Sequence, residues 1–130
     1  MSNKPIIDLK DDYMVVTGTG VRRNFMDIID GTVKIYNAAK ELNISRVIGD
    51  YRKVRYEVAM SEAFNLVRYY EMKLPDFYNI SMASVSNPKD LEIAKFWEEL
   101  CNKRGFNAAV FTDYNSAEKW ILNQPINKIT

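Results

Sequence analysis

The chain has 130 residues, a length that fits one domain and can bury a hydrophobic core without disulfides or a structural metal. Its one cysteine and lack of histidine exclude intramolecular disulfides, zinc sites built from several Cys or His ligands, and catalytic triads with a histidine base. Its 18 basic and 17 acidic residues nearly balance, so whole-chain charge favours neither nucleic acid nor an anionic membrane as a partner.

The N-terminal residues predict a β-hairpin. Short apolar runs over residues 5–9 and 13–19 are separated by a polar turn at residues 10–12. The sequence Gly18-Thr19-Gly20 lacks the third glycine of a dinucleotide-binding fingerprint, because Arg23 stands in its place. We therefore interpret Gly20 as a flexible joint between the second strand and the next helix.

A long helix is predicted over residues 25–42, because apolar residues recur there at three- and four-residue steps. Asn24 is placed to cap its N-terminus. Gly31 lies inside this helix and lowers its stability by about 1 kcal/mol relative to alanine. The glycine therefore indicates either a close packing contact or a kink.

From residue 46 onward, strands and helices alternate. The clearest helix start is at Asn87 and Pro88, because asparagine can cap a helix and proline suits the first helical position. The expected elements are a strand over 46–49 that ends at Asp50, a helix over 57–72, a strand over 78–85, a helix from Pro88 to Arg104, a strand over 108–112 and a helix that starts at Asn115.

The predicted order is β-β-α-β-α-β-α-β-α. Strands that are each separated by a helix pair in parallel, whereas the first two should pair antiparallel. We therefore expect an α/β fold with a mixed sheet of about five strands and four helices. A single domain should cover residues 1–122, followed by a C-terminal tail over residues 123–130.

Three segments follow one another in the chain: Arg46–Asp50, Arg104–Phe106, and Val110–Asp113 followed by Ala117 and Trp120–Leu122. In this order they resemble the STAS domain family (sulfate transporter and anti-sigma-factor antagonist), and within it the SpoIIAA-like branch that is grouped with CRAL-TRIO lipid-binding folds. The likeness spans residues 6 to 122. It implies a small sheet with helices, and a function exerted through protein or ligand contacts rather than catalysis.

The sequence departs from this family at its best-known switch. In the anti-sigma antagonists, a phosphorylatable serine follows the aspartate of the third strand. Here Tyr51, Arg52 and Lys53 follow Asp50, and the first downstream serine is Ser61, inside the predicted second helix. The resemblance therefore implies the fold without a phosphorylation switch at this position.

Ligands in open α/β sheets bind beyond the C-terminal ends of parallel strands. The loops expected there are 50–55, 84–87 and 113–115, joined by 18–23 if the second strand runs parallel to the others. Their cations and tyrosines suit an anionic ligand, a phosphorylated partner or an acidic protein segment, with a solvated charged loop as the alternative. The candidate binding residues are Arg22, Asp50, Tyr51, Arg52, Arg55, Ser84 and Asn87.

Three further features have a structural interpretation. Asp50 is expected to cap a turn or pair with a nearby arginine, in preference to binding a metal or substrate. Cys101 is interpreted as a packing residue, because no histidine exists to activate it. The aromatic cluster at residues 68–77 lines an apolar pocket or a dimer interface, or belongs to the core.

The leading functional expectation is a non-catalytic regulatory or protein-interaction module, with a protein partner that contacts the loop after Asp50 and a homodimer as one expected assembly. The alternative is a carrier of a small anionic or lipid-like ligand, with an apolar pocket under the second helix and a headgroup site near Arg22 or Arg52. An enzyme of unknown class ranks third. No cofactor, metal or nucleic acid is expected. Without a signal segment or an apolar run of about 20 residues, the chain is predicted to be cytoplasmic and to lack a membrane span.

Overall fold

The computed structural model describes residues 5–129, in which strands and helices alternate in the predicted order. The strands are β1 (Ile6–Leu9), β2 (Met14–Arg22), β3 (Arg46–Tyr56), β4 (Ser81–Ser86) and β5 (Asn107–Phe111). The α-helices are α1 (Phe25–Leu42), α2 (Ser61–Lys73), α3 (Leu91–Lys103) and α4 (Tyr114–Leu122). Two 3₁₀ helices, η1 (Pro75–Asn79) and η2 (Pro88–Asp90), precede β4 and α3 respectively.

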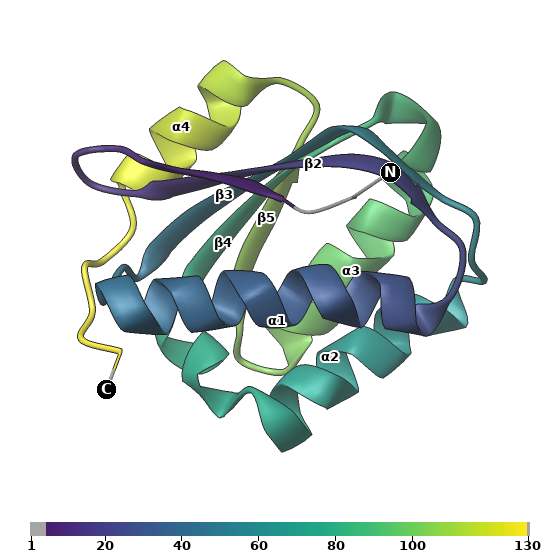
Figure 1. Cartoon of the computed structure of the whole chain (residues 1–130), viewed down its shortest axis with the longest axis horizontal. Coiled ribbons are helices and arrows are strands. Elements are labelled where there is room, and N and C mark those ends of the chain that lie inside the picture. The colour runs from purple at the N-terminus through teal and green to yellow at the C-terminus, as the bar shows by residue number, and fades with distance from the viewer. Residues whose placement is uncertain (1–4, 130) are drawn as a thin grey trace.

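The predicted mixed sheet is confirmed. Its strands lie in the order β1-β2-β3-β4-β5, with β1 antiparallel to β2 and every other pair parallel. Helices α1, α2 and α3 lie on one face of the sheet, and α4 lies on the other (Figure 1). Crossovers of one hand that step in a single direction along a sheet keep their helices on one face, whereas α4 follows the last strand and is free of this constraint.

Side-chain alternation along the strands produces two hydrophobic cores. Val47 and Met82 face α1, α2 and α3, whereas Ile48 and Val85 face α4. These strands are buried on both faces, which explains their nearly continuous apolar runs. Within residues 5–129, no helix has the length and apolar composition needed to cross a membrane.

Strands β2 and β3 are longer than the sequence predicted. The expected loop over residues 50–55 is wrong, because β3 continues to Tyr56 and pairs with β2 along this extension. Gly20, predicted as a joint, lies within β2 and opposite Val54 with a φ of 93°. The strand was not predicted over these residues, because the exposed charged side chains of Arg52 and Lys53 interrupt its apolar pattern.

The extension of β3 contains a β-bulge. Thr17 of β2 pairs with Asp50, and Thr19 pairs with Lys53, so β3 advances three residues where β2 advances two. One extra residue in a strand reverses the alternation of side chains that follow it. The bulge therefore changes which residues of β3 face the helices.

Helix boundaries follow local capping. Asn24 caps α1 as predicted, accepting a hydrogen bond from the Asp27 amide at 3.0 Å. Helix α4 is instead capped by Asp113, whose carboxylate accepts from the Ser116 amide at 2.8 Å. The prediction of Asn115 was wrong, because an N-cap needs extended backbone and Asn115 already lies inside the helix.

Three further predicted starts differ from the observed ones, because a neighbouring element occupies the residues in question. Helix α2 begins at Ser61 rather than at residue 57, because β3 occupies the preceding residues up to Tyr56. Strand β4 begins at Ser81 rather than at residue 78, because η1 extends to Asn79. The predicted helix start at Pro88 is the 3₁₀ turn η2, which leads directly into α3.

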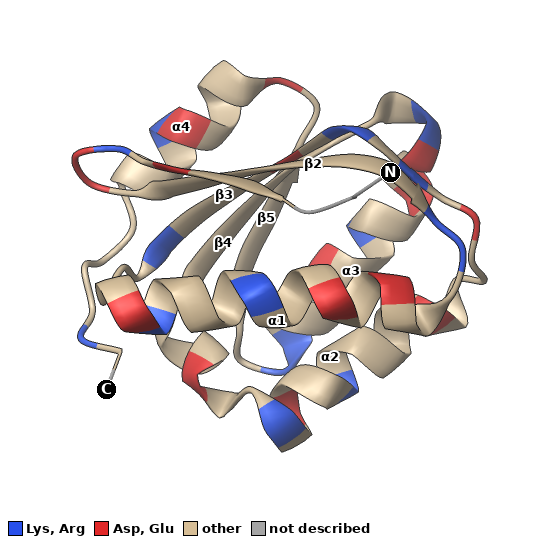
Figure 2. Cartoon of the chain, in the orientation of Figure 1, with Lys and Arg blue, Asp and Glu red and all other residues tan. Residues whose placement is uncertain are grey.

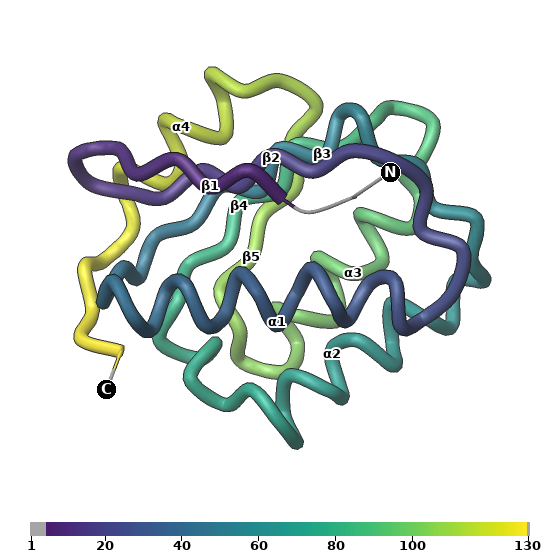
Figure 3. Tube along the Cα trace, in the orientation of Figure 1, coloured from purple at the N-terminus to yellow at the C-terminus, as the bar shows by residue number. Residues whose placement is uncertain are grey.

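The C-terminal segment 123–129 has no regular secondary structure, yet it packs against the start of β3 (Figure 3). The Arg46 guanidinium donates through Nε to the carbonyl oxygen of Gln124 at 3.0 Å. The Asn127 amide donates to Ser45 Oγ at 2.8 Å, and Ile129 is only 3% exposed. The segment therefore completes one end of the core, beside the C-terminal end of α1.

Candidate functional site

A cavity of about 130 Å³ lies between the sheet and helices α1, α2 and α3. Strands β2, β3 and β4 form its floor, and the inner faces of the three helices form its walls. Most of its lining is apolar, and a smaller polar part lies near the C-terminal ends of the strands. The main apolar residues are Val16, Ile35, Val47, Leu66, Phe77 and Met82.

Arg22 is the cation that lines this cavity. It ends β2 on the same face as Val16 and Gly18, and it is only 8% exposed. Its Nη1 donates to the Thr19 carbonyl oxygen at 2.8 Å. Among residues 5–129, no ion pair includes Arg22. A buried charge without an opposite charge is costly, so this guanidinium is a strong candidate for anion binding.

The remaining guanidinium donors of Arg22 face open space. Within the described part of the chain, every fully buried side-chain nitrogen or oxygen has a hydrogen-bond partner. The Arg22 guanidinium makes only the Thr19 hydrogen bond among these residues, so its other N–H groups are not fully buried and remain accessible. They are therefore available to a ligand.

Tyr51 and Tyr56 line the cavity from β3. Residues five apart in a regular strand point to opposite faces, and the bulge between them brings both rings to the helix side. Burial raises the pKa of both phenols, that of Tyr56 to about 12, although the positive charge of Arg22 acts in the opposite direction. Both hydroxyls therefore stay protonated at neutral pH and can donate hydrogen bonds.

Two glycines make room for the Tyr51 ring. A Cβ atom on Gly49 would lie 2.5 Å from Cε2 of Tyr51, and one on Gly18 would lie 3.0 Å from Cδ1. The ring consequently lies close against the strand backbone at both positions. Any side chain at residue 49 would displace it.

The helices leave space above the sheet. Ile28, Gly31, Thr32 and Ile35 line the cavity from one face of α1, and a Cβ atom on Gly31 would meet no atom within 4 Å. The predicted close packing contact at Gly31 is therefore wrong. Trp97 of α3, which was not among the predicted site residues, is half-buried at the cavity wall and donates from Nε1 to the Tyr70 hydroxyl at 3.1 Å.

Arg52 pairs with its neighbour and does not line the cavity. It donates to both carboxylate oxygens of Asp50, from Nε at 2.9 Å and from Nη2 at 2.7 Å. This confirms the expectation that Asp50 pairs with a nearby arginine. The hydrogen bonds from Arg52 hold the pKa of the Asp50 carboxyl below its usual value.

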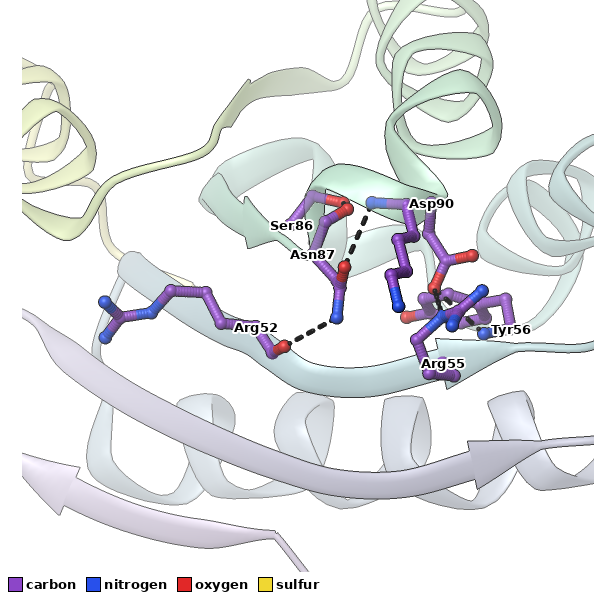
Figure 4. Close-up of polar contacts among 7 residues, drawn as sticks. Arg52, Arg55, Tyr56, Ser86, Asn87 and Asp90 are labelled. Carbon is purple, nitrogen blue, oxygen red and sulfur yellow. Dashed lines mark hydrogen bonds and ion pairs between the residues drawn. The ribbon is translucent and has the colours of Figure 1, made fainter.

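Arg55 is also paired. Its Nε donates to Asp90 Oδ2 at 3.0 Å, and the same oxygen accepts from the Tyr56 amide at 3.1 Å (Figure 4). Asp90 is 7% exposed, so this contact joins β3 to the start of α3 in a largely buried position. Arg55 is therefore a structural residue rather than a free cation.

Asn87 links β3 to the 3₁₀ helix η2. Its Nδ2 donates to the Arg52 carbonyl oxygen, and its Oδ1 accepts from the Lys89 amide, both at 3.0 Å (Figure 4). In contrast, Ser84 lies on β4 opposite Gly49 and lines the cavity. The predicted site residues thus divide into an inner group of Arg22, Tyr51 and Ser84 and an outer group of Asp50, Arg52, Arg55 and Asn87.

The structure also tests the interpretations of Cys101 and of the aromatic cluster at residues 68–77. Cys101 is fully buried and packs in the core, and burial raises the pKa of its thiol, as expected for a packing residue. Tyr70 and Phe77 of the predicted aromatic cluster belong to the core and also line the cavity, whereas Met72 is 66% exposed. A pocket under α2 is therefore present, although core residues build much of it.

No protein-family model matches the sequence, and neither does any curated protein. Among solved structures, the chain matches a crystal structure of an anti-sigma factor antagonist from Mycobacterium paratuberculosis with a TM-score of 0.63. The match covers 92% of this chain and 94% of that chain, at 12% sequence identity. The fold is similar to that of an anti-sigma factor antagonist. This confirms the fold that the resemblance to SpoIIAA-like domains implied.

Proposed function

We propose that this chain is a non-catalytic regulatory module that acts by binding a protein partner. The main support is the fold that it shares, along nearly its whole length, with a protein named as an antagonist of an anti-sigma factor. The chemistry of the chain agrees, because it has no histidine and its single cysteine is buried with a raised pKa. Residues 51–53 contain no serine, so we propose that phosphorylation at this position does not control the interaction.

We propose that the partner contacts the strand-end surface, which we define as Arg52, Lys53, Asn87 and Lys89. Arg52 and Lys53 are exposed on β3, and Lys89 is exposed on η2. The bidentate pair with Asp50 holds Arg52 in one geometry, which lowers the entropic cost of binding. Elsewhere on the visible helices and loops, acidic and basic residues are interspersed (Figure 2). The three cations of the strand-end surface would therefore suit an acidic segment of a partner protein.

The first test is affinity capture with the tagged full-length protein from cells of its own source, with identification of the retained protein by mass spectrometry. The purified partner is then titrated against the wild type and against Arg52→Glu and Lys53→Glu. We expect each reversal to weaken binding by about tenfold or more, which corresponds to about 1.4 kcal/mol. Arg55 is left unchanged, because its loss would leave the buried Asp90 without its cation.

Lys34→Glu is the matched control. Lys34 is exposed on α1, on a different element from the strand-end surface, and it carries the same charge change. The control should bind the partner like the wild type. Equal affinity of the strand-end reversals and the wild type would remove this surface from the proposal, and failure to retain any specific protein would count against the function itself.

A further inference from the structure

We propose that the cavity between the sheet and helices α1, α2 and α3 binds a small organic carboxylate with an apolar body, and that Arg22 holds the carboxylate. This inference goes beyond the protein-binding role and does not depend on it. It rests on the charge, the polarity gradient and the size of the cavity.

One group in the lining, the guanidinium of Arg22, favours an anion. Arg22 is 8% exposed, and one of its side-chain N–H groups donates to the Thr19 carbonyl oxygen. It has no carboxylate partner among residues 5–129. Tyr51 and Tyr56 line the same space, and their hydroxyls make no hydrogen bond within those residues. A guanidinium fork matches the two oxygens of a carboxylate, and the phenols supply further donors.

The distribution of polar groups favours an amphipathic ligand. Arg22, Tyr56 and Ser86 line the cavity and are the last residues of β2, β3 and β4, at the strand ends where parallel sheets bind ligands. Val47 and Met82, nearer the N-terminal ends of β3 and β4, continue the lining as an apolar floor. The carboxylate would therefore lie at the strand ends, with the apolar body directed toward the interior. Inorganic phosphate would leave that apolar lining without a contact.

The volume limits the size of the ligand. The cavity measures about 130 Å³. An apolar protein cavity of about 150 Å³ holds benzene, so a body of about one six-membered ring fits inside this cavity, whereas a long acyl chain would have to extend out of it. This narrows the lipid-like ligand that the sequence suggested to a much smaller molecule.

One acidic residue also lines the cavity. Glu62 is half-buried near the start of α2, and its Oε1 accepts from Asn65 Nδ2 at 2.6 Å. It makes no ion pair with Arg22 within the described residues. Because Glu62 repels negative charge, the site should prefer a monoanion to a dianion.

The test uses NMR titration of the ¹⁵N-labelled full-length protein with sodium benzoate and with benzamide, its neutral counterpart. Benzoate should shift the amides of β2, β3 and β4 around the cavity and saturate them, and benzamide should bind about tenfold or more weakly. This comparison needs no substitution, so it stands even if an Arg22 variant fails to fold. Absence of saturable shifts with benzoate, or equal binding of benzamide, would overturn the proposal.

Two variants locate the site. Arg22→Met should weaken benzoate binding by about tenfold or more, whereas Lys53→Met, which removes an exposed cation, should leave it unchanged. Gly31→Leu adds a side chain at the cavity wall, where a Cβ atom would meet nothing within 4 Å, so it should reduce binding. Full binding by both Arg22→Met and Gly31→Leu would place the benzoate site elsewhere and sink the assignment.

Two further ligands test the predicted size and polarity. Decanoate should bind no more tightly than benzoate, because its chain exceeds the cavity. Inorganic phosphate should not shift the cavity amides at equal concentration. Tighter binding of decanoate would overturn the size limit, and equal binding of phosphate would overturn the requirement for an apolar body.

Discussion

Arg55 and Asp90 form the ion pair that connects the end of β3 to the start of α3, with Arg55 Nε 3.0 Å from Asp90 Oδ2. The Asp90 side chain is 7% exposed, whereas that of Arg55 is 42% exposed. The cost of losing either partner is therefore asymmetric. Without Arg55, a buried carboxylate keeps only the Tyr56 amide as a donor, whereas without Asp90 the arginine can turn toward water.

We expect Arg55→Met to lower the free energy of unfolding by about 2 kcal/mol, because it leaves a buried charge without its partner. The measurement is urea denaturation at neutral pH. Arg52→Met provides the control, because the Arg52 side chain is 50% exposed and pairs with its own neighbour Asp50. It should cost less than about 1 kcal/mol. Equal losses in the two variants would show that burial of Asp90 does not determine the effect.

Replacement of Gly31 by alanine should stabilise the protein. The glycine lies inside α1, and an added Cβ atom meets nothing within 4 Å. We expect a gain of about 0.5–1 kcal/mol, from the higher helix propensity of alanine alone. Thermal and urea unfolding measure this gain. A loss of stability would mean that α1 lies closer to its neighbours than this geometry allows.

Replacement of Gly49 by alanine should have the opposite effect. Its Cβ atom would lie 2.5 Å from the Tyr51 ring, which must move toward the cavity to avoid the clash. Overpacking of this kind costs about 1–3 kcal/mol. Urea denaturation gives the loss, and the double variant Gly49→Ala with Tyr51→Leu provides the check. If the shorter side chain does not restore part of the stability, the ring is not the cause.

Stability should fall in acid partly through Asp50. Hydrogen bonds from Arg52 lower the pKa of Asp50 in the folded state, so the unfolded chain binds more protons as the pH drops. The contribution of Asp50 to the free energy of unfolding is therefore present above the pKa of the unfolded chain, about 3.9. It is lost as the pH falls through the lower pKa of Asp50 in the folded state. Unfolding free energies measured from pH 6 down to pH 2 should decline less steeply for Asp50→Asn than for the wild type. Identical slopes would contradict this contribution.

The C-terminal segment should contribute to stability despite its lack of regular structure. Ile129 is 3% exposed, and its amide donates to Asn43 Oδ1 at 3.1 Å. We expect Ile129→Ala to cost about 2 kcal/mol, at the low end for a buried isoleucine because the segment has no regular secondary structure. Ile126→Ala is the control, since Ile126 is 73% exposed and should be neutral. A neutral Ile129→Ala would mean that the segment does not belong to the cooperative unit.

Local sequence determined the type and order of the elements. The Asn24 cap depends only on neighbouring residues, and it appears in the structure as predicted. Where prediction failed, distant contacts decided the outcome. Strand β3 continues through the polar residues Arg52 and Lys53, because β2 provides hydrogen-bonding partners beside it.

The division between the inner and outer groups of predicted site residues could come only from the tertiary structure. Arg22 and Arg52 are equivalent in sequence terms, since each follows an apolar strand near the same edge of the sheet. Arg22 lies on the face that α1, α2 and α3 cover, whereas Arg52 turns back to Asp50. The direction of a strand side chain depends on its register with neighbouring strands, and the bulge between β2 and β3 resets that register at the site. The sequence therefore determined that cations and tyrosines would gather at the strand ends, and tertiary packing decided which of them face the cavity.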